Sequence, residues 1–202
     1  NNQYSRGMYV RYQKGVYINE NKLQGQSSYN YSTGIQCYYC DESSIISNNF
    51  INGFSGYGIY SYYSDGTLTE RNKIFNNFIN LSDGGVGYGG IYINQGSYID
   101  ISHNTIKNNN SNSNSYAIYE SGGSNKNYSN NIFYSQNGYA AYFGSTSSFQ
   151  SDNNSFYASG SNLIRHNSPS YTLSNWQSFS GKEVNSINTN PNFLSPNSYQ
   201  VN

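Results

Sequence analysis

The chain repeats a short motif six times, and this repeat constrains the fold more than any other feature. Each unit begins with a small, an apolar and a polar residue, and an asparagine follows 14 or 15 residues later. Successive units begin 23 to 32 residues apart. Constant spacing within units and variable spacing between them is typical of a solenoid with loops of different length. The triplets begin at Gly7, Gly34, Gly58, Gly90, Ala117 and Ala140, and the asparagines are Asn21, Asn49, Asn72, Asn104, Asn131 and Asn154.

Composition is compatible with a folded, weakly charged domain. Only 10% of the 202 residues are charged and the net charge is zero, which argues against nucleic acid or an anionic membrane surface as partner. Aromatic residues make up 17% of the chain, more than a disordered polar segment contains. No apolar run reaches the length needed to cross a bilayer, so we predict no membrane insertion.

Each unit predicts short strands separated by bends. Residues 90–93 form one expected strand, with Ile91 and Ile93 on the same face. Residues 98–102 form a second strand, and a third begins at Thr105 after a bend at Asn104. If the coils stack, equivalent strands pair in parallel about 4.8 Å apart, and about seven coils make a rod on the order of 30 Å long.

Stacking gives the repeated asparagines a structural role. Inside a bend, each side-chain amide can donate a hydrogen bond to one neighbouring coil and accept one from the other. Such a row also satisfies backbone groups at corners where sheet pairing stops. We therefore interpret the six asparagines as a ladder that belongs to the scaffold and not to a ligand site.

Two elements of the repeat resemble a known family. Gly-Ile-Tyr occurs at residues 58–60 and 90–92, and the Asn-Asn-apolar bend of residues 46–51 recurs at residues 128–133. These elements resemble the right-handed parallel β-helix repeats of the pectin-lyase-like superfamily. The resemblance implies an all-β, right-handed parallel β-helix. It implies no single activity, because this superfamily includes lyases, hydrolases, epimerases, tail-spike proteins and adhesins.

The C-terminal residues 167–202 are predicted to cap the coils formed by residues 1–166. A seventh triplet begins at Asn162, but Trp176 stands where its asparagine is expected. An open end would expose unpaired strand edges, and we expect Trp176, Phe179 and Phe193 to cover it. Residues 173–177, 190–196 and 199–201 resemble the closing segment of large secreted surface proteins from bacteria with a type IX secretion system. This resemblance implies sequence beyond Asn202, and the missing initial Met leads us to expect a longer exported precursor.

The third position of the triplet predicts a row of tyrosines on the outside of the solenoid. Aromatic rings beside amides and hydroxyls suit sugars, because rings contact C–H groups while polar groups bind hydroxyls. The alternative is that stacked tyrosines only stabilise a parallel sheet. Gln36 interrupts the row in the second unit, and Tyr12, Tyr38, Tyr39, Tyr62 and Tyr63 lie nearby. The candidates for glycan contact are Tyr9, Tyr60, Tyr92, Tyr119 and Tyr142.

Charged and sulfur-containing residues point to no catalytic group, metal site or cofactor. Arg71 and His103 each precede an asparagine of the predicted ladder and are expected to be neighbours, but solvated surface charges are the simpler interpretation. A lyase of this fold would need a base and a cluster of carboxylates. The sequence contains no such carboxylate cluster. Cys37 and Cys40 form a single CxxC, which lacks the second ligand pair of a zinc site. The alternatives are a local disulfide, two buried small residues, or one cysteine facing in and the other out.

These features together favour a secreted or bacterial cell-surface module. We expect a carbohydrate-binding or adhesive part of a larger exported protein, with a polysaccharide or surface glycan as partner. Secretion machinery or other domains of the same protein are further expected partners. Two other functions stay open: a polysaccharide lyase or glycoside hydrolase acting on an acidic glycan, and a structural spacer or passenger cargo of a secretion system.

Overall fold

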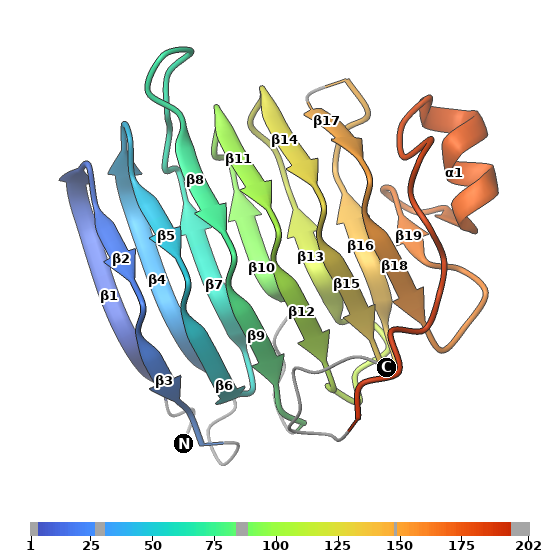
Figure 1. Ribbon diagram of the computed structural model, residues 1–202, viewed down its shortest axis with the longest axis horizontal. Coiled ribbons are helices and arrows are strands. Elements are labelled where there is room, and N and C mark those ends of the chain that lie inside the picture. The colour runs from blue at the N-terminus through green and yellow to red at the C-terminus, as the bar shows by residue number, and fades with distance from the viewer. Residues whose placement is uncertain (1–3, 27–30, 84–88, 148, 195–202) are drawn as a thin grey trace.

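The chain folds into a solenoid of three parallel sheets. Figure 1 shows the computed structural model, in which successive coils lie side by side along the long axis. The structure describes residues 4–26, 31–83, 89–147 and 149–194. The expected motif at residues 199–201 and the end of the motif at residues 190–196 therefore lie outside the described residues.

Sheet A has eight strands, and each coil contributes its first strand to it. The expected strand at residues 90–93 is confirmed as β10. The strands follow one another in the order β1, β4, β7, β10, β13, β16, β19, β20, and all pairs are parallel except the last. Their bounds are β1 Tyr4–Lys14, β4 Tyr31–Asp41, β7 Tyr57–Tyr62, β10 Gly89–Asn94, β13 Tyr116–Glu120, β16 Tyr139–Phe143, β19 Ile164–Arg165 and β20 Ser170–Tyr171.

Sheets B and C each have six parallel strands, contributed by the second and third strand of every coil. The solenoid therefore has six complete coils, and the expected seventh ends after β19. In sheet B the strands are β2 Tyr17–Asn19, β5 Ile45–Ser47, β8 Asn72–Phe75, β11 Ile99–Ser102, β14 Lys126–Ser129 and β17 Phe149–Asp152. In sheet C they are β3 Lys22–Gln24, β6 Phe50–Phe54, β9 Phe78–Leu81, β12 Thr105–Asn108, β15 Ile132–Ser135 and β18 Ser155–Ala158.

The core is built from columns of apolar side chains, one residue per coil. The middle residues of the six triplets form the column in sheet A, and from Ile35 to Ala141 each of them is fully buried. Ile164 continues the column in β19, so the seventh unit is in register one residue later than the triplet predicted at Asn162. The first residue of a triplet is small because side chains of sheet C lie directly against it. A Cβ atom on Gly58 would lie 2.3 Å from Ile79, and one on Gly90 would lie 2.1 Å from Ile106.

The asparagine ladder is present, but one of its members differs from the prediction. Each ladder asparagine except the last donates two hydrogen bonds, from its backbone N–H and from its side-chain Nδ2, to the Oδ1 of the asparagine in the next coil. The donor–acceptor distances are 2.9 to 3.1 Å. Asn77, and not Asn72, occupies the third position. The ladder runs through Asn21, Asn49, Asn77, Asn104, Asn131 and Asn154.

Asn72 has another structural role, because the third coil has a longer turn between sheets A and B. This turn places the ladder asparagine 19 residues after Gly58, instead of 14 or 15. Asn72 begins β8 and faces the interior, where Oδ1 accepts from the Ser44 N–H at 2.9 Å. Its Nδ2 donates to the Cys40 carbonyl at 3.1 Å.

The C-terminal segment closes the far end of the solenoid by imitating a further coil. Ser186 takes the place of the next ladder residue, since its Oγ accepts from the Asn154 N–H at 2.8 Å. The buried Glu183 carboxylate accepts from Ser186, from Ser151 and from the Asn154 amide. Ile187 then pairs in parallel with Ser155.

The aromatic residues expected at this end have three different environments. α1 (Leu173–Ser180) places Trp176 over the last coil, where its fully buried ring stacks on Phe143 at 5.7 Å. Phe179 stacks on Tyr171 but stays 53% exposed. Phe193 does not cover the end, because it lies beside sheet C against Tyr134. No helix among the described residues combines the length and apolarity that a bilayer-spanning helix requires.

Removal of one ladder amide is expected to cost about 2–3 kcal/mol of unfolding free energy, because several buried backbone groups lose their partners. The variant is Asn104→Ala: the Asn104 amide donates to the Ile74 and Ser102 carbonyls and accepts from the Asn77 N–H. Urea unfolding followed by circular dichroism measures the change. Asn127→Ala, which removes an exposed amide, is the control and should stay within about 0.5 kcal/mol of the parent. Equal effects of the two variants would show that the ladder is not a stabilising element.

Candidate functional site

The tyrosines of the triplets form one column on the outer face of sheet A. Register pairs Tyr60 with Tyr92, Tyr92 with Tyr119, and Tyr119 with Tyr142. We call these four residues the central tyrosine column. Gln36 separates them from Tyr9, which lies in the same line two coils before Tyr60.

The rings of the central tyrosine column contact each other along the axis. Tyr60 and Tyr92 stack with centroids 4.9 Å apart, and Tyr119 and Tyr142 stack at 4.4 Å. Tyr92 meets Tyr119 edge to face at 4.8 Å. Neighbouring rings therefore cover much of each ring face, as expected for aromatic pairs that stabilise a sheet. The column offers a ligand mainly ring edges and hydroxyl groups.

The hydroxyl groups of Tyr60, Tyr92 and Tyr119 stay protonated at neutral pH. Burial raises the pKa of the Tyr60 and Tyr119 hydroxyls, and it also raises the pKa of Tyr92. Asn94 donates a hydrogen bond to the Tyr60 oxygen at 3.4 Å, and Ser121 donates to the Tyr92 oxygen at 3.2 Å. The column is therefore a neutral hydrogen-bonding surface.

Tyr9 differs from the other candidates because it lies at the exposed end of the column. Its side chain is 46% exposed and meets Tyr38 edge to face at 5.8 Å. The guanidinium of Arg6 lies 4.9 Å from its ring centre, which is a cation–π contact. Tyr9 therefore has a different chemical environment from Tyr60 and the residues that follow it.

A second row of tyrosines is more exposed than the central column. Tyr12, Tyr39 and Tyr63 are 68%, 37% and 39% exposed, and we call them the exposed tyrosine row. Their rings stack at 5.3 and 5.7 Å. All three have a left-handed backbone, with φ of 54°, 51° and 45°. Bulky residues rarely adopt this conformation, and such strain is concentrated at functional sites.

The left-handed residue explains why two consecutive tyrosines point outward. Cys37 and Cys40 are both buried, whereas Tyr38 and Tyr39 between them lie on the outside. An extra residue with αL geometry in a strand breaks the alternation of faces. Single-sequence periodicity cannot detect such a bulge, although the repeated Tyr-Tyr pairs at 38–39 and 62–63 are a visible signal.

The two cysteines are unbonded thiols in the structure, so the local disulfide is not formed. Cys37 and Cys40 are instead two small buried side chains, as one of the alternatives predicted. The Cys40 thiol donates to the Val10 carbonyl, with sulfur and oxygen 3.5 Å apart. A hydrogen bond with Cys40 and burial raise the pKa of the Cys37 thiol. The same hydrogen bond lowers the pKa of the Cys40 thiol, but both thiols are buried and neither is an exposed nucleophile.

The structure separates the two charged residues that the sequence predicted to be neighbours. Arg71 does not pair with His103: its Nε lies 2.8 Å from Asp100 Oδ1, and its Nη2 donates to the Asn125 carbonyl at 2.7 Å. His103 instead occupies the position equivalent to Asn76, because Asn77 is the ladder residue of the third coil. Within the described residues, no three His, Cys, Asp or Glu side chains gather where they could hold a metal ion.

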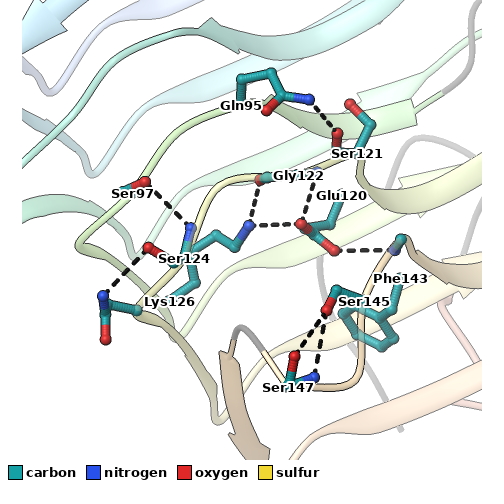
Figure 2. Close-up of polar contacts among 12 residues, drawn as sticks. Gln95, Ser97, Glu120, Ser121, Gly122, Ser124, Lys126, Phe143, Ser145 and Ser147 are labelled. Carbon is teal, nitrogen blue, oxygen red and sulfur yellow. Dashed lines mark hydrogen bonds and ion pairs between the residues drawn. The ribbon is translucent and has the colours of Figure 1, made fainter.

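An ion pair that the sequence did not predict lies inside the fifth coil. Within the described part of the chain, Glu120 and Lys126 form the one ion pair whose side chains are both fully buried, at 2.5 Å. Figure 2 shows the Glu120 carboxylate between Lys126, the turn at Gly122 and the backbone after Phe143. Its oxygens accept from the N–H groups of Gly122 and Gly144 at 2.8 and 3.0 Å. The bond from Gly144 joins the Glu120 carboxylate to the sixth coil, and the buried pair is closed to substrates.

Comparison with known families gives a match to a family model. The model of a family described as "Right handed beta helix region" matches residues 1–156. No curated protein and no solved structure shows a significant match to the chain.

Proposed function

Because the chain belongs to the right-handed β-helix family, we propose that it is a glycan-binding module built on a rigid solenoid. The contact surface is the exposed tyrosine row together with the central tyrosine column. The observation that carries the proposal is the exposed tyrosine row. Three successive coils hold a solvent-exposed Tyr12, Tyr39 and Tyr63 in a backbone conformation that tyrosine rarely adopts.

The chemistry of this surface fits an extended polysaccharide. Successive rings follow the coil spacing of about 4.8 Å, which is close to the length of one sugar unit in an extended chain. Ring edges and the outermost ring face can contact C–H groups, while the tyrosine hydroxyls bind sugar hydroxyls. A chain lying along the solenoid axis would thus meet equivalent groups in each coil, and many weak contacts would add up.

The proposed setting is a bacterial surface. A rigid solenoid with few charges and a row of aromatic contacts would serve as the carbohydrate-binding or adhesive part of a larger exported protein. The C-terminal motifs support export by a type IX secretion system, with secretion machinery or neighbouring domains as further partners. The low charge speaks against nucleic acid as a partner.

Replacing the exposed tyrosine row is expected to weaken polysaccharide binding about tenfold or more, which corresponds to about 1.4 kcal/mol. The variant is Tyr12→Asn, Tyr39→Asn and Tyr63→Asn combined, since asparagine tolerates the left-handed backbone and removes only the ring. Native electrophoresis through gels containing plant, algal or host polysaccharides measures retardation. Tyr17→Asn removes a tyrosine that is 68% exposed on sheet B and is the matched control.

Three outcomes of this experiment are informative. Retardation that the triple variant loses and the Tyr17 control keeps supports the proposal. A cleared zone in the polysaccharide stain would instead establish the alternative of a lyase or hydrolase. Unchanged migration of the parent protein on every polymer would contradict binding and favour a spacer or passenger.

A further inference from the structure

A long polar groove follows the ends of the strands of sheet C. It has a volume of about 820 Å³, which is within the range of ligand sites. Residues of five successive coils line it, so the groove extends along the solenoid axis. We call it the amide groove because side-chain amides dominate its lining: Gln24, Gln26, Asn52, Asn80, Asn109, Gln136 and Asn137, with Ser82, Asp83 and Ser111 beside them.

Four of these amides form a hydrogen-bonded row along the groove. Asn52 Nδ2 donates to Gln24 Oε1 at 2.9 Å, and Asn80 Nδ2 donates to Asn52 Oδ1 at 2.6 Å. Asn109 Nδ2 continues the row by donating to Asn80 Oδ1 at 2.8 Å. In this row each side-chain Nδ2 donates to the preceding coil, whereas in the internal ladder each Nδ2 donates to the following coil. The row holds the amides in fixed orientations before any ligand arrives.

The row leaves part of each amide for another partner. A carboxamide has two N–H groups and two oxygen lone pairs. Asn52 uses one N–H toward Gln24 and one lone pair toward Asn80. A donor and an acceptor on the same small group match two neighbouring hydroxyls of a sugar, one of which accepts while the other donates.

The lining of the groove also indicates which ligands it would accept. Among the described residues that line it, Asp83 is the one charged residue, and its Oδ1 accepts from the Ser111 N–H at 2.9 Å. A groove lined by neutral amides offers no counter-charge to an acidic chain, and a lipid or an apolar peptide would leave these amides without hydrogen-bond partners. An uncharged, hydroxyl-rich chain fits this surface best.

We propose that the amide groove is a second glycan site, which binds a neutral oligosaccharide along the solenoid axis. It is separate from the tyrosine surface, because it follows the ends of sheet C whereas the tyrosines lie on the outer face of sheet A. With two sites, one module can hold two polymer chains, and such bivalency strengthens attachment without new contacts.

The test monitors the groove amides directly. Neutral hexasaccharides of cellulose, xylan and galactan are titrated into ¹⁵N-labelled protein, and the side-chain NH₂ resonances of Asn52, Asn109 and Gln136 are followed by NMR. We expect these resonances to shift with at least one neutral oligosaccharide. Ser111→Trp fills the groove from an exposed position on its wall and should weaken this binding at least tenfold.

Two controls keep the outcome distinct from that of the tyrosine experiment. Ser113→Trp places the same ring at an exposed position of the same loop that does not line the groove, and it should leave the affinity unchanged. The triple variant at Tyr12, Tyr39 and Tyr63 should keep the NH₂ shifts. The proposal is overturned by absent shifts, by equal affinities of the two tryptophan variants, by loss of the shifts in the tyrosine variant, or by tighter binding of acidic oligosaccharides.

Discussion

Lys126→Met is expected to lower the free energy of unfolding by about 3–5 kcal/mol, because it leaves a buried carboxylate without its counter-charge. Glu120 and Lys126 are both fully buried, and Lys126 also donates to the Gly122 carbonyl. Burial lowers the pKa of the Lys126 ammonium, and the Glu120 carboxylate opposes this effect. Guanidinium unfolding followed by circular dichroism measures the change.

Two further variants test whether burial is the cause. Lys14→Met removes the exposed partner of Glu42, whose interaction is screened by solvent, and should change the unfolding free energy far less than Lys126→Met. Glu120→Leu combined with Lys126→Met removes both buried charges and should recover most of the lost stability. A double variant that is less stable than Lys126→Met alone would mean that the hydrogen bonds of Glu120 to the backbone matter more than charge balance.

Trp176→Ala is expected to cost about 3–5 kcal/mol, since it empties the space between α1 and the last coil. The Trp176 ring is fully buried, stacked on Phe143 and in edge contact with Tyr171 at 5.5 Å. In a solenoid each coil rests on its neighbours, so loss of the cap should expose the final coils first. Hydrogen exchange should therefore accelerate most in β16 and β18.

Phe179→Ala is the matched control for the cap, because it removes a ring from the same helix that is 53% exposed. It should change the unfolding free energy by about 1 kcal/mol or less. If exchange accelerated equally in β4 and β16 of the Trp176 variant, the coils would unfold as a single unit and the cap would have no local role.

The sequence predicted the coils because their repeat is local and strictly spaced. The triplet places a small residue where sheet C approaches, an apolar residue inside and a polar residue outside, and the structure confirms this order in β7, β10 and β13. The prediction of Asn72 was wrong because it relied on a constant offset. Asn76-Asn77-Phe78-Ile79 has the same pattern as residues 48–51, so matching the local motif would have identified Asn77.

The remaining features depend on contacts that no local pattern contains. Glu183 and Ser186 end the ladder from a position about thirty residues after Asn154, and nothing in their spacing marks this role. Glu120 stands at an inward position that is apolar in neighbouring coils, where Ile93 and Phe143 are its register partners. Its partner Lys126 lies across a turn, and only the folded turn brings the two charges together.

The tyrosine surface was predicted in part. The column from Tyr60 to Tyr142 follows from alternation, because every triplet repeats the same outward position. Stacking of the rings on each other could not be predicted from the sequence, because side-chain orientation depends on neighbours in other coils. The exposure of Tyr39 likewise depends on a left-handed residue that interrupts alternation.

The direction of the internal ladder has a consequence for self-assembly. Amyloid filaments elongate because each end exposes a strand edge and an amide row that template the next molecule. In this solenoid the last donors of the row are already bound by Ser186 and Glu183 of the same chain. Helix α1 lies over the last coil at that end. The cap therefore occupies the amide donors that a second copy would need at this end of the ladder, so it opposes fibre growth as well as stabilising the solenoid.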